Sequence, residues 1–581
     1  MSDRLQEKMK NKFLAFLTSA IFLISALSAP GATASGESIS FTYAPGKGYF
    51  GINADPAFLN TFTTPWLSGR EVGADGLVKS VSNCSSLSDP KCSKANVFKA
   101  RSMMPMCISE SDMNCIEKVS ATNAAGENLE VQTGEKFPGA QPQDYVGDPD
   151  RKLPSGGAAP MVTIPGAPHA GGNKYVLIFN PAGDIDLRYS TTAEFTPTFT
   201  GGIFAVSTKS GNFNVGSDMT TLAFLQSMGT KGAFNGMSQA GDIRQGCLIN
   251  DANSCAVAQP MPLDVTFSVK VRINFQVVSW FSGRLTDPTV KIESSSNGAK
   301  TITVTAKPAT VPKVFRWSKK SDLPKNLLDF YASLPKPLGG TGDLGVLQTD
   351  DPSAWSLLRQ LTSYDERMMQ EFLLWLPVIG DKSDYLPTLW TVRSMNTGYI
   401  QNPCLISSSE VLGIVSTNAS QYLEGPPVFN NLTSSLEYKV AAPHLKPDGE
   451  VFRGSYDLQI RSAAARCLYG FSNAPISATV EVVSENGEKQ VAVTTVNEKD
   501  GWLYLSAKGF TFSSPVVNVK LTQEKATEAP APTPTASPSE TPAAVAKPVV
   551  AKKITITCVK GKTSKKVTAV NPKCPMGYKK K

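Results

Sequence analysis

The chain has 581 residues, two histidines and no Cys-x-x-Cys pair, which excludes the usual ligand spacings of a zinc centre. Its length suits more than one hydrophobic core. The net charge of +8 is uneven, because eleven lysines and no acidic residue follow Ala546, which leaves the body mildly acidic. We therefore expect an electrostatic partner at the C-terminal end, and no nucleic-acid partner.

Residues 1–34 have the three parts of a secretory signal peptide. An apolar run from Phe13 to Leu27 precedes the small-residue site Ala32-Thr33-Ala34 and follows four basic residues, Arg4, Lys8, Lys10 and Lys12. This run of about 15 residues is shorter than the ~20 that a membrane-spanning helix needs. We expect cleavage after Ala34, a secreted chain retained at the cell surface or wall, and no integral membrane protein once the signal is removed.

Ten cysteines suit an oxidising compartment. Three neighbouring pairs share the spacing Cys-x7-Cys and enclose turn-forming Ser, Asp or Asn residues, so each pair can close a local loop. The predicted disulfides are Cys84–Cys92, Cys107–Cys115, Cys247–Cys255, Cys404–Cys467 and Cys558–Cys574.

Residues 35–170 form an N-terminal disulfide-containing region whose fold the sequence does not predict. Met103-Met104-Pro105-Met106 could bind Cu(I) through thioethers, but an apolar approach to the next cysteine loop is favoured, since no histidine lies nearby. The acidic residues of DYVGDPD (144–150) could bind Ca²⁺, but they lack EF-hand spacing, which favours a solvated loop.

Residues 171–312 are predicted to be a β-rich domain. The segment 265–277 alternates apolar and polar residues, as expected for a strand with one buried face. Asn297-Gly298 separates two further alternating runs and predicts a hairpin.

Residues 313–395 are predicted to contain a helical segment near 322–376. KNLLDFYAS (325–333) reads as a short helix. Apolar residues at helical spacing over 352–376 predict an amphipathic helix ended by Pro377, with Arg359 on its polar side. We expect this helix to pack on a sheet rather than on a membrane, because its polar side mixes both charge signs.

Residues 396–523 are predicted to form a β-sandwich-like domain, with turns at Asn486-Gly487 and Asp500-Gly501 between alternating runs. The Pro/Ala/Thr-rich segment 524–553 is predicted to be a disordered linker. Overall, the fold class is mainly β with sandwich-like modules.

Residues 554–581 are predicted to be a basic tail module, a two-stranded hairpin (555–560 and 565–570) closed by a disulfide. Its lysines are expected to bind anionic cell-envelope polymers. They are Lys560, Lys562, Lys565, Lys566, Lys573, Lys579, Lys580 and Lys581. A solvated basic tail without a target is the alternative, but the cysteine pair argues for a defined shape.

Motifs of catalysis are missing from the sequence. It contains no His-Glu-x-x-His and no Walker A motif, and a serine nucleophile would have only His169 or His444 as its base. We predict no catalytic, cofactor-binding or metal-binding residues and no cofactor.

The tail ITITCVKGKTSKKVTAVNPKCPMGYKKK resembles a C-terminal segment of exported proteins of Actinobacteria, where it also follows Pro/Ala/Thr-rich linkers. The blocks 280–288, 467–483 and 498–515 resemble parts of uncharacterised secreted proteins of the same bacteria. The resemblance implies a secreted or cell-surface protein and implies no catalytic residues.

The leading hypothesis is a non-enzymatic cell-surface or wall-associated protein, which binds an unknown ligand with its β-rich body and attaches to the envelope with its tail. The alternative is a secreted polysaccharide hydrolase with a paired Asp/Glu mechanism, which leaves no sequence motif. A cleft with paired carboxylates about 5–10 Å apart, ringed by Trp or Tyr, would favour the hydrolase. A solute-binding receptor is a weaker third hypothesis, because strand–helix alternation is missing.

Overall fold

The computed structural model describes many separate segments of the chain. These are residues 49–54, 65–137, 145–211, 247–250, 253–276, 279–294, 299–333, 357–361, 366–395, 402–407, 410–423, 425–472, 476–483, 489–491, 493–512, 516–523, 554–560, 563–569, 572–575 and 578–580. The predicted signal peptide and linker lie outside them. The chain divides into two units, Met1–Glu524 and Lys525–Lys581.

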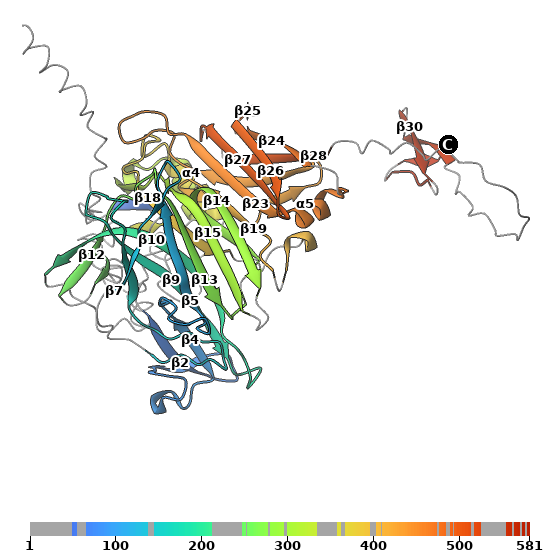
Figure 1. Ribbon diagram of the computed structural model, residues 1–581. Coiled ribbons are helices and arrows are strands. Elements are labelled where there is room, and N and C mark those ends of the chain that lie inside the picture. Colours follow the sequence, from blue (N-terminus) through green and yellow to red (C-terminus); the bar gives the residue numbers. More distant parts are fainter. Residues whose placement is uncertain are drawn as a thin grey trace, which may run out of the picture. The chain divides into compact units, whose positions relative to one another are not determined.

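The fold is mainly β, as predicted (Figure 1). In the first unit, a large sheet closes on itself and includes strands from almost the whole length of that unit. Its strands are β2 (Trp66–Val72), β3 (Val78–Asn83), β4 (Val97–Arg101), β5 (Cys115–Thr122), β6 (Asn128–Leu129), β7 (Gln132–Phe137), β8 (Ala159–Thr163), β9 (Lys174–Asp186), β10 (Thr196–Ser210), β11 (Cys247–Asn250), β12 (Ser254–Ala258), β13 (Thr266–Ile273), β14 (Trp280–Ser294), β15 (Lys300–Thr310), β18 (Thr388–Ser394), β19 (Gly413–Thr417), β23 (Gly454–Arg461), β26 (Val493–Lys499) and β27 (Trp502–Phe510).

Two predicted elements of this sheet are present. Strand β13 alternates half-buried and buried residues along its whole length, and β14 and β15 form the antiparallel hairpin expected around Asn297-Gly298. The buried faces of β5, β13 and β15 contribute to one core. This agrees with burial of one face in an antiparallel sheet.

The hydrogen bonding crosses the predicted domain boundaries at residues 170 and 312. Strand β5 pairs with β13, β4 pairs with β9, and β14 pairs with both β18 and β19. Local patterning shows where strands occur but not which strands pair, so the predicted boundaries followed composition rather than the sheet.

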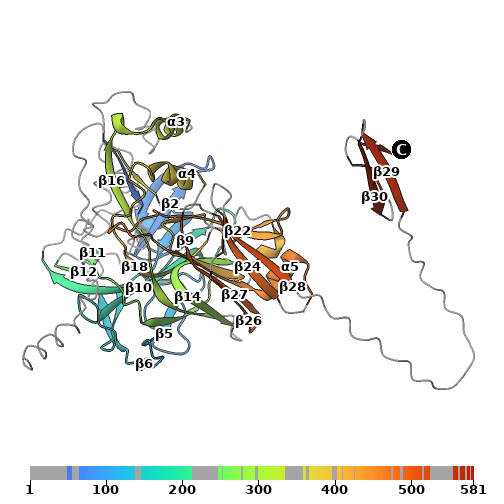
Figure 2. The same cartoon turned by 90° about the horizontal axis from the view of Figure 1, so that it is seen from above.

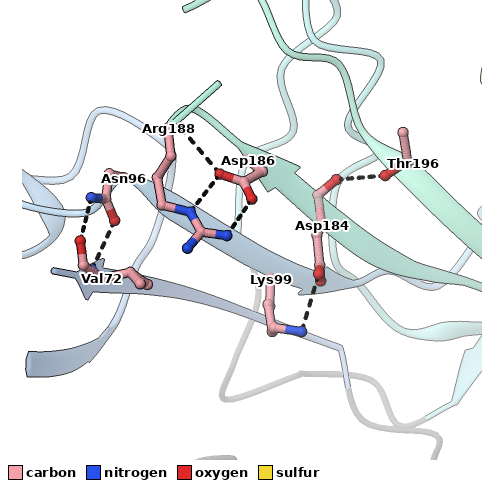
Figure 3. Close-up of polar contacts among 7 residues, drawn as sticks. All are labelled: Val72, Asn96, Lys99, Asp184, Asp186, Arg188 and Thr196. Atoms are coloured by element: carbon pink, nitrogen blue, oxygen red, sulfur yellow. Dashed lines mark hydrogen bonds and ion pairs between the residues drawn. The ribbon is translucent and has the colours of Figure 1, made fainter. Parts of the chain in front are cut away.

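Polar contacts lie on and around the paired strands β4 and β9 (Figure 3). Asn96 exchanges two 2.8 Å hydrogen bonds with the backbone of Val72, and Lys99 forms a 3.1 Å ion pair with Asp184. On the same strand as Asp184, Asp186 forms a 2.7 Å ion pair with Arg188. Of these contacts, the Lys99–Asp184 ion pair joins segments on the two sides of residue 170.

A second sheet of six strands packs against part of the large sheet as a sandwich. Leu436 and Val519 from this sheet share a core with Leu458 and Leu505 from β23 and β27. Its strands are β20 (Gln421–Tyr422), β21 (Val428–Asn430), β22 (Ser435–Ala441), β24 (Ile476–Val483), β25 (Lys489–Val491) and β28 (Val516–Gln523). The predicted hairpins β24–β25 and β26–β27 are both present, but they belong to different sheets. Helix α5 (Ser462–Tyr469) follows β23 and ends at Gly470, whose φ of 64° suits a helix C-cap.

The predicted amphipathic helix over 352–376 is partly wrong. Leu357–Gln360 is strand β17, which pairs in parallel with β1 (Tyr49–Ala54), and helix α4 covers only Glu366–Trp375. Pairing with a distant strand overrides the local helical period here. Strand β16 (Val314–Lys319) completes this three-stranded sheet on the other side of β1.

Helix α3 spans Lys325–Ser333, as predicted, and it shares a core with α4 and the three-stranded sheet. Arg359, predicted to lie on the polar side of that helix, is instead a strand residue buried in an ion pair with Glu371 of α4. The described helices include none that is long and apolar enough to cross a membrane.

Four of the predicted disulfides are present, Cys84–Cys92, Cys107–Cys115, Cys404–Cys467 and Cys558–Cys574. Cys255 is also disulfide-bonded, and the side chain of its predicted partner Cys247 lies outside the described residues. In the first two loops an aspartate binds the backbone of the turn. Asp89 accepts hydrogen bonds from Ser85 and Lys91 N–H groups, and Asp112 accepts them from Ile108 and Ser109.

The second unit contains a three-stranded sheet in the order β30 (Thr563–Ala569), β29 (Ile554–Lys560), β31 (Lys579–Lys580). The predicted hairpin is β29–β30, and β31 adds an edge strand that the sequence did not predict.

Candidate functional site

A polar surface covers the outer face of β23, β26 and β27 in the first unit. Side chains of successive strand residues point to opposite faces. Since Leu458, Leu503 and Leu505 face the sandwich core, their neighbours in each strand face outward.

The strand register arranges these outward residues in three rows. Trp502 of β27 lies directly opposite Arg461 of β23 on one side and Lys499 of β26 on the other. The next row is Gln459, Tyr504 and Asn497, and the third contains Asp457 and Ser506. Directly opposed residues share a face. The surface therefore runs from a cationic row, through an amide and phenol row, to an acidic and hydroxyl row.

The β14–β15 hairpin lies beside this surface (Figures 1 and 2) and forms the other wall of a cavity of about 790 Å³. Gln459 fixes the hairpin, because its side chain accepts a 2.8 Å hydrogen bond from Val290 N–H and donates a 2.9 Å bond to Val290 C=O. The hairpin contributes Asp287–Ile292, Thr303 and Thr305 to the lining. We call this space the β14–β27 cavity.

A bulge in β14 turns Asp287 toward the cavity. The register of β14 and β15 shifts between Thr286 and Thr289, and Asp287 has a φ of 52°, in the left-handed region. Bulges commonly redirect a side chain in this way. The Asp287 carboxylate is ion-paired with Lys508 of β27.

Asp457 is the buried acid of the cavity. The residue is 4% exposed, and its carboxylate oxygen Oδ2 makes no hydrogen bond of good geometry among the described residues. Burial raises its pKa to about 6, and the nearby Asp287 adds to this effect, whereas Ser506 and Lys508 oppose it. A carboxyl group of this kind can exchange a proton at mildly acidic pH.

Arg461 is positioned by an aromatic ring rather than by a carboxylate. Its guanidinium carbon lies 4.0 Å from the centre of the Trp502 ring, a cation–π contact. Within the described part of the chain, no acidic residue pairs with it, and its Nε has no hydrogen-bond partner. The guanidinium therefore remains available to an anionic ligand.

The predicted lysine site lies in the second unit. Lys560, Lys565, Lys566, Lys573, Lys579 and Lys580 are exposed, whereas Lys562 and Lys581 lie outside the described residues. Lys565 and Lys580 both lie opposite Cys558 and share its face, while Lys566 and Lys579 lie on the other face. The Cys558–Cys574 disulfide fastens this sheet, so positive charge projects from both of its faces.

Other residues considered in the sequence are engaged elsewhere. Met103 and Met104 are buried, 2% and 0% exposed, which supports the apolar interpretation. His169 contacts the backbone at Lys174 and Gly171 and does not line the β14–β27 cavity. Asp148 binds the backbone N–H of Arg151, as a loop residue does. In the described segments, no group of three or more His, Cys, Asp or Glu side chains is placed to bind a metal ion.

Local sequence patterns do not single out Asp457, Arg461 and Asp287 as site residues. Their signal was present in the alternation of 457, 459 and 461 with apolar residues, but alternation does not show which strand lies opposite.

A search with models of protein families finds no match to this chain, and a comparison with curated proteins finds none either.

Proposed function

We propose that this is an exported, non-enzymatic cell-surface protein that attaches to anionic envelope polymers through its basic tail and binds a ligand with its β-rich body. The observation that carries the proposal is the tail module. It forms a unit of its own, closed by a disulfide, and it presents lysines on both faces of its sheet. A polymer chain can contact both faces of this sheet, whereas a flat surface can contact only one face.

Attachment by lysine charge is expected to depend on salt, because the Debye length falls from about 10 Å at 0.1 M to about 3 Å at 1 M. The mature chain should therefore bind isolated cell envelopes at 0.1 M salt and elute at 1 M. Replacing Lys565, Lys566, Lys579 and Lys580 by glutamine should weaken binding at least tenfold, at about 1 kcal/mol per lysine near an anionic surface. The measurement is sedimentation of the protein with the envelopes.

The matched control replaces four exposed lysines of the first unit, Lys79, Lys91, Lys94 and Lys118, by glutamine. This change removes the same charge and should leave binding unchanged. Equal loss in both variants, or binding that persists in 1 M salt, would contradict tail attachment.

The alternative function, a polysaccharide hydrolase, is supported by one specific observation. The β14–β27 cavity brings Asp457 and Asp287 together with Trp502 and Tyr504. We favour a binding role for one physical reason. Asp287 is engaged in an ion pair with Lys508, whereas both carboxylates of a glycosidase must be free to act at the scissile bond.

The two candidate functions, ligand binding and polysaccharide hydrolysis, differ in whether the protein releases products from a polysaccharide. A hydrolase should release reducing ends from a panel of neutral and acidic polysaccharides, and Asp457→Asn and Asp287→Asn should each abolish this release. Asp448→Asn, a change at an exposed turn residue, should have no effect. No release by the unmodified protein would support the binding role, and release that both cavity variants retain would place catalysis elsewhere.

A further inference from the structure

The charges of the β14–β27 cavity are separated along its length. Arg461 and Lys499 belong to the first row of the wall, and Asp457 lies four residues from Arg461 along β23. At about 3.3 Å per residue, the two ends are about 13 Å apart. The cavity therefore offers a cationic end and, at the other end, the buried acid Asp457 beside the Asp287–Lys508 ion pair, to one ligand that is longer than a single small ring.

The cationic end suits a carboxylate. Arg461 is held in place by Trp502, and none of the described acidic residues pairs with it. A guanidinium binds a carboxylate through two parallel hydrogen bonds. Lys499 lies beside Arg461 across Trp502. Lys291, which also lines the cavity, is already paired with Glu293, and Asp500 contributes one negative charge at the adjoining turn. Glu410 lines a small neighbouring pocket together with Arg461 and Lys300. Arg461 and Lys499 are the two cations at this end for which the described residues show no ion pair.

The middle of the cavity suits a saccharide. Asn497, Thr303 and Thr305 can exchange hydrogen bonds with hydroxyl groups. Val290, Ile292 and the Tyr504 ring provide apolar contact for the C–H faces of sugar rings. Such a mixture of apolar surface and a few polar groups is typical of small-molecule sites.

The acidic end has unsatisfied buried groups. Oδ2 of Asp457 and Oγ of Ser506 lie opposite each other in register, and the nearby Ser506 hydroxyl lowers the pKa of Asp457, but neither atom makes a hydrogen bond of good geometry among the described residues. Buried polar atoms without partners are unfavourable, and a ligand hydroxyl group would satisfy both of them.

We propose that the β14–β27 cavity binds a carboxylate-bearing oligosaccharide, with the carboxylate on Arg461 and Lys499 and hydroxyl groups at Asp457 and Ser506. The inference rests on the proposed ligand-binding role of the body. It does not depend on the tail.

Isothermal titration calorimetry with a trimer of galacturonic acid and with its methyl ester tests the proposal, since esterification removes the carboxylate charges and leaves the sugar rings and their hydroxyl groups in place. The tail lysines could bind the acid non-specifically. For this reason the mature chain is compared with a variant in which Lys560, Lys562, Lys565, Lys566, Lys573, Lys579, Lys580 and Lys581 are all glutamine. We expect both proteins to bind the acid at least tenfold more tightly than the ester.

Arg461→Gln should remove this preference, and Arg453→Gln, at an exposed arginine outside the cavity lining, should leave it unchanged. Because Arg461 packs on Trp502, its loss could disturb the fold. Lys499→Gln, at an exposed position, provides a second test and should weaken acid binding several-fold without changing the melting temperature.

Three results would overturn the proposal: no binding of either probe at millimolar concentration, equal binding of acid and ester, or loss of acid binding in the tail variant. The last result would leave tail attachment standing. Conversely, cavity binding combined with failure of envelope attachment would remove only the tail proposal.

Discussion

Glu371→Ala is expected to lower the free energy of unfolding by about 3–5 kcal/mol, the usual cost of leaving one member of a buried ion pair alone. Glu371 is 0% exposed and binds Arg359 of β17 through two hydrogen bonds of 2.8 and 2.9 Å. Tyr331 of α3 donates a 2.8 Å bond to the same carboxylate, and Trp375 donates one to Tyr331. The substitution therefore removes the centre of a network that joins α3, α4 and the three-stranded sheet.

Urea unfolding followed by tryptophan fluorescence measures this effect. The control is Glu366→Ala in the same helix, where the carboxylate is exposed and paired with Lys439. Exposed pairs contribute about 0–1 kcal/mol, so the control should be nearly neutral. Similar losses in the two variants would show that the buried network does not stabilise this part of the fold.

Asp457→Asn is expected to stabilise the protein at pH 7.5 by up to about 3 kcal/mol and to change little at pH 4. The pKa of Asp457 is about 6 in the folded chain, against 3.8 as the ordinary value for an aspartate. Between pH 3.8 and pH 6, the Asp457 carboxyl group holds its proton in the folded state and has lost it in the unfolded state. The contribution of the protonated acid is therefore fully present below pH 3.8 and is lost as the pH rises through 6. At about 1.36 kcal/mol per pKa unit, the total is on the order of 3 kcal/mol.

The test compares unfolding free energies of the two proteins across pH 4–8. The difference between them is the relevant quantity, because acids with lowered pKa values, such as Asp112 and Glu498, destabilise both proteins alike as the pH falls. Asp448→Asn serves as the control and should show a flat difference. A difference for Asp457→Asn that does not vary with pH would show that burial does not penalise its charge.

A stability gain from this substitution would have a functional meaning. A buried, unpaired carboxyl group destabilises the fold at neutral pH, and such groups are concentrated at binding and catalytic sites. Loss of ligand binding together with a gain of stability would assign Asp457 to the site rather than to the core.

Some elements of this fold could be predicted from local patterns. The alternation that predicts β13, the turns between β24 and β25 and between β26 and β27, and helix α3 all depend on residues close in sequence. The pairing of cysteines eight residues apart is local in the same sense, since a short loop closes at little entropic cost. The tail hairpin also belongs here, because its register depends on one short turn.

Other elements depend on partners that the sequence places far away. Leu357–Gln360 has a helical period, yet it is a strand because β1, some 300 residues earlier, offers it a parallel partner. The same helical period places Arg359 on the polar side of a helix, whereas the strand buries it against Glu371.

The composition and spacing of residues determined the β-rich class, the local hairpins, most of the disulfide pairing and the position of the basic charge. Tertiary structure alone decided which strands close the large sheet and how Asp287, Asp457 and Arg461 meet in one cavity. The physical reason is that strand patterning repeats every two residues and is the same for any partner, whereas a site depends on which strands pair and in which register.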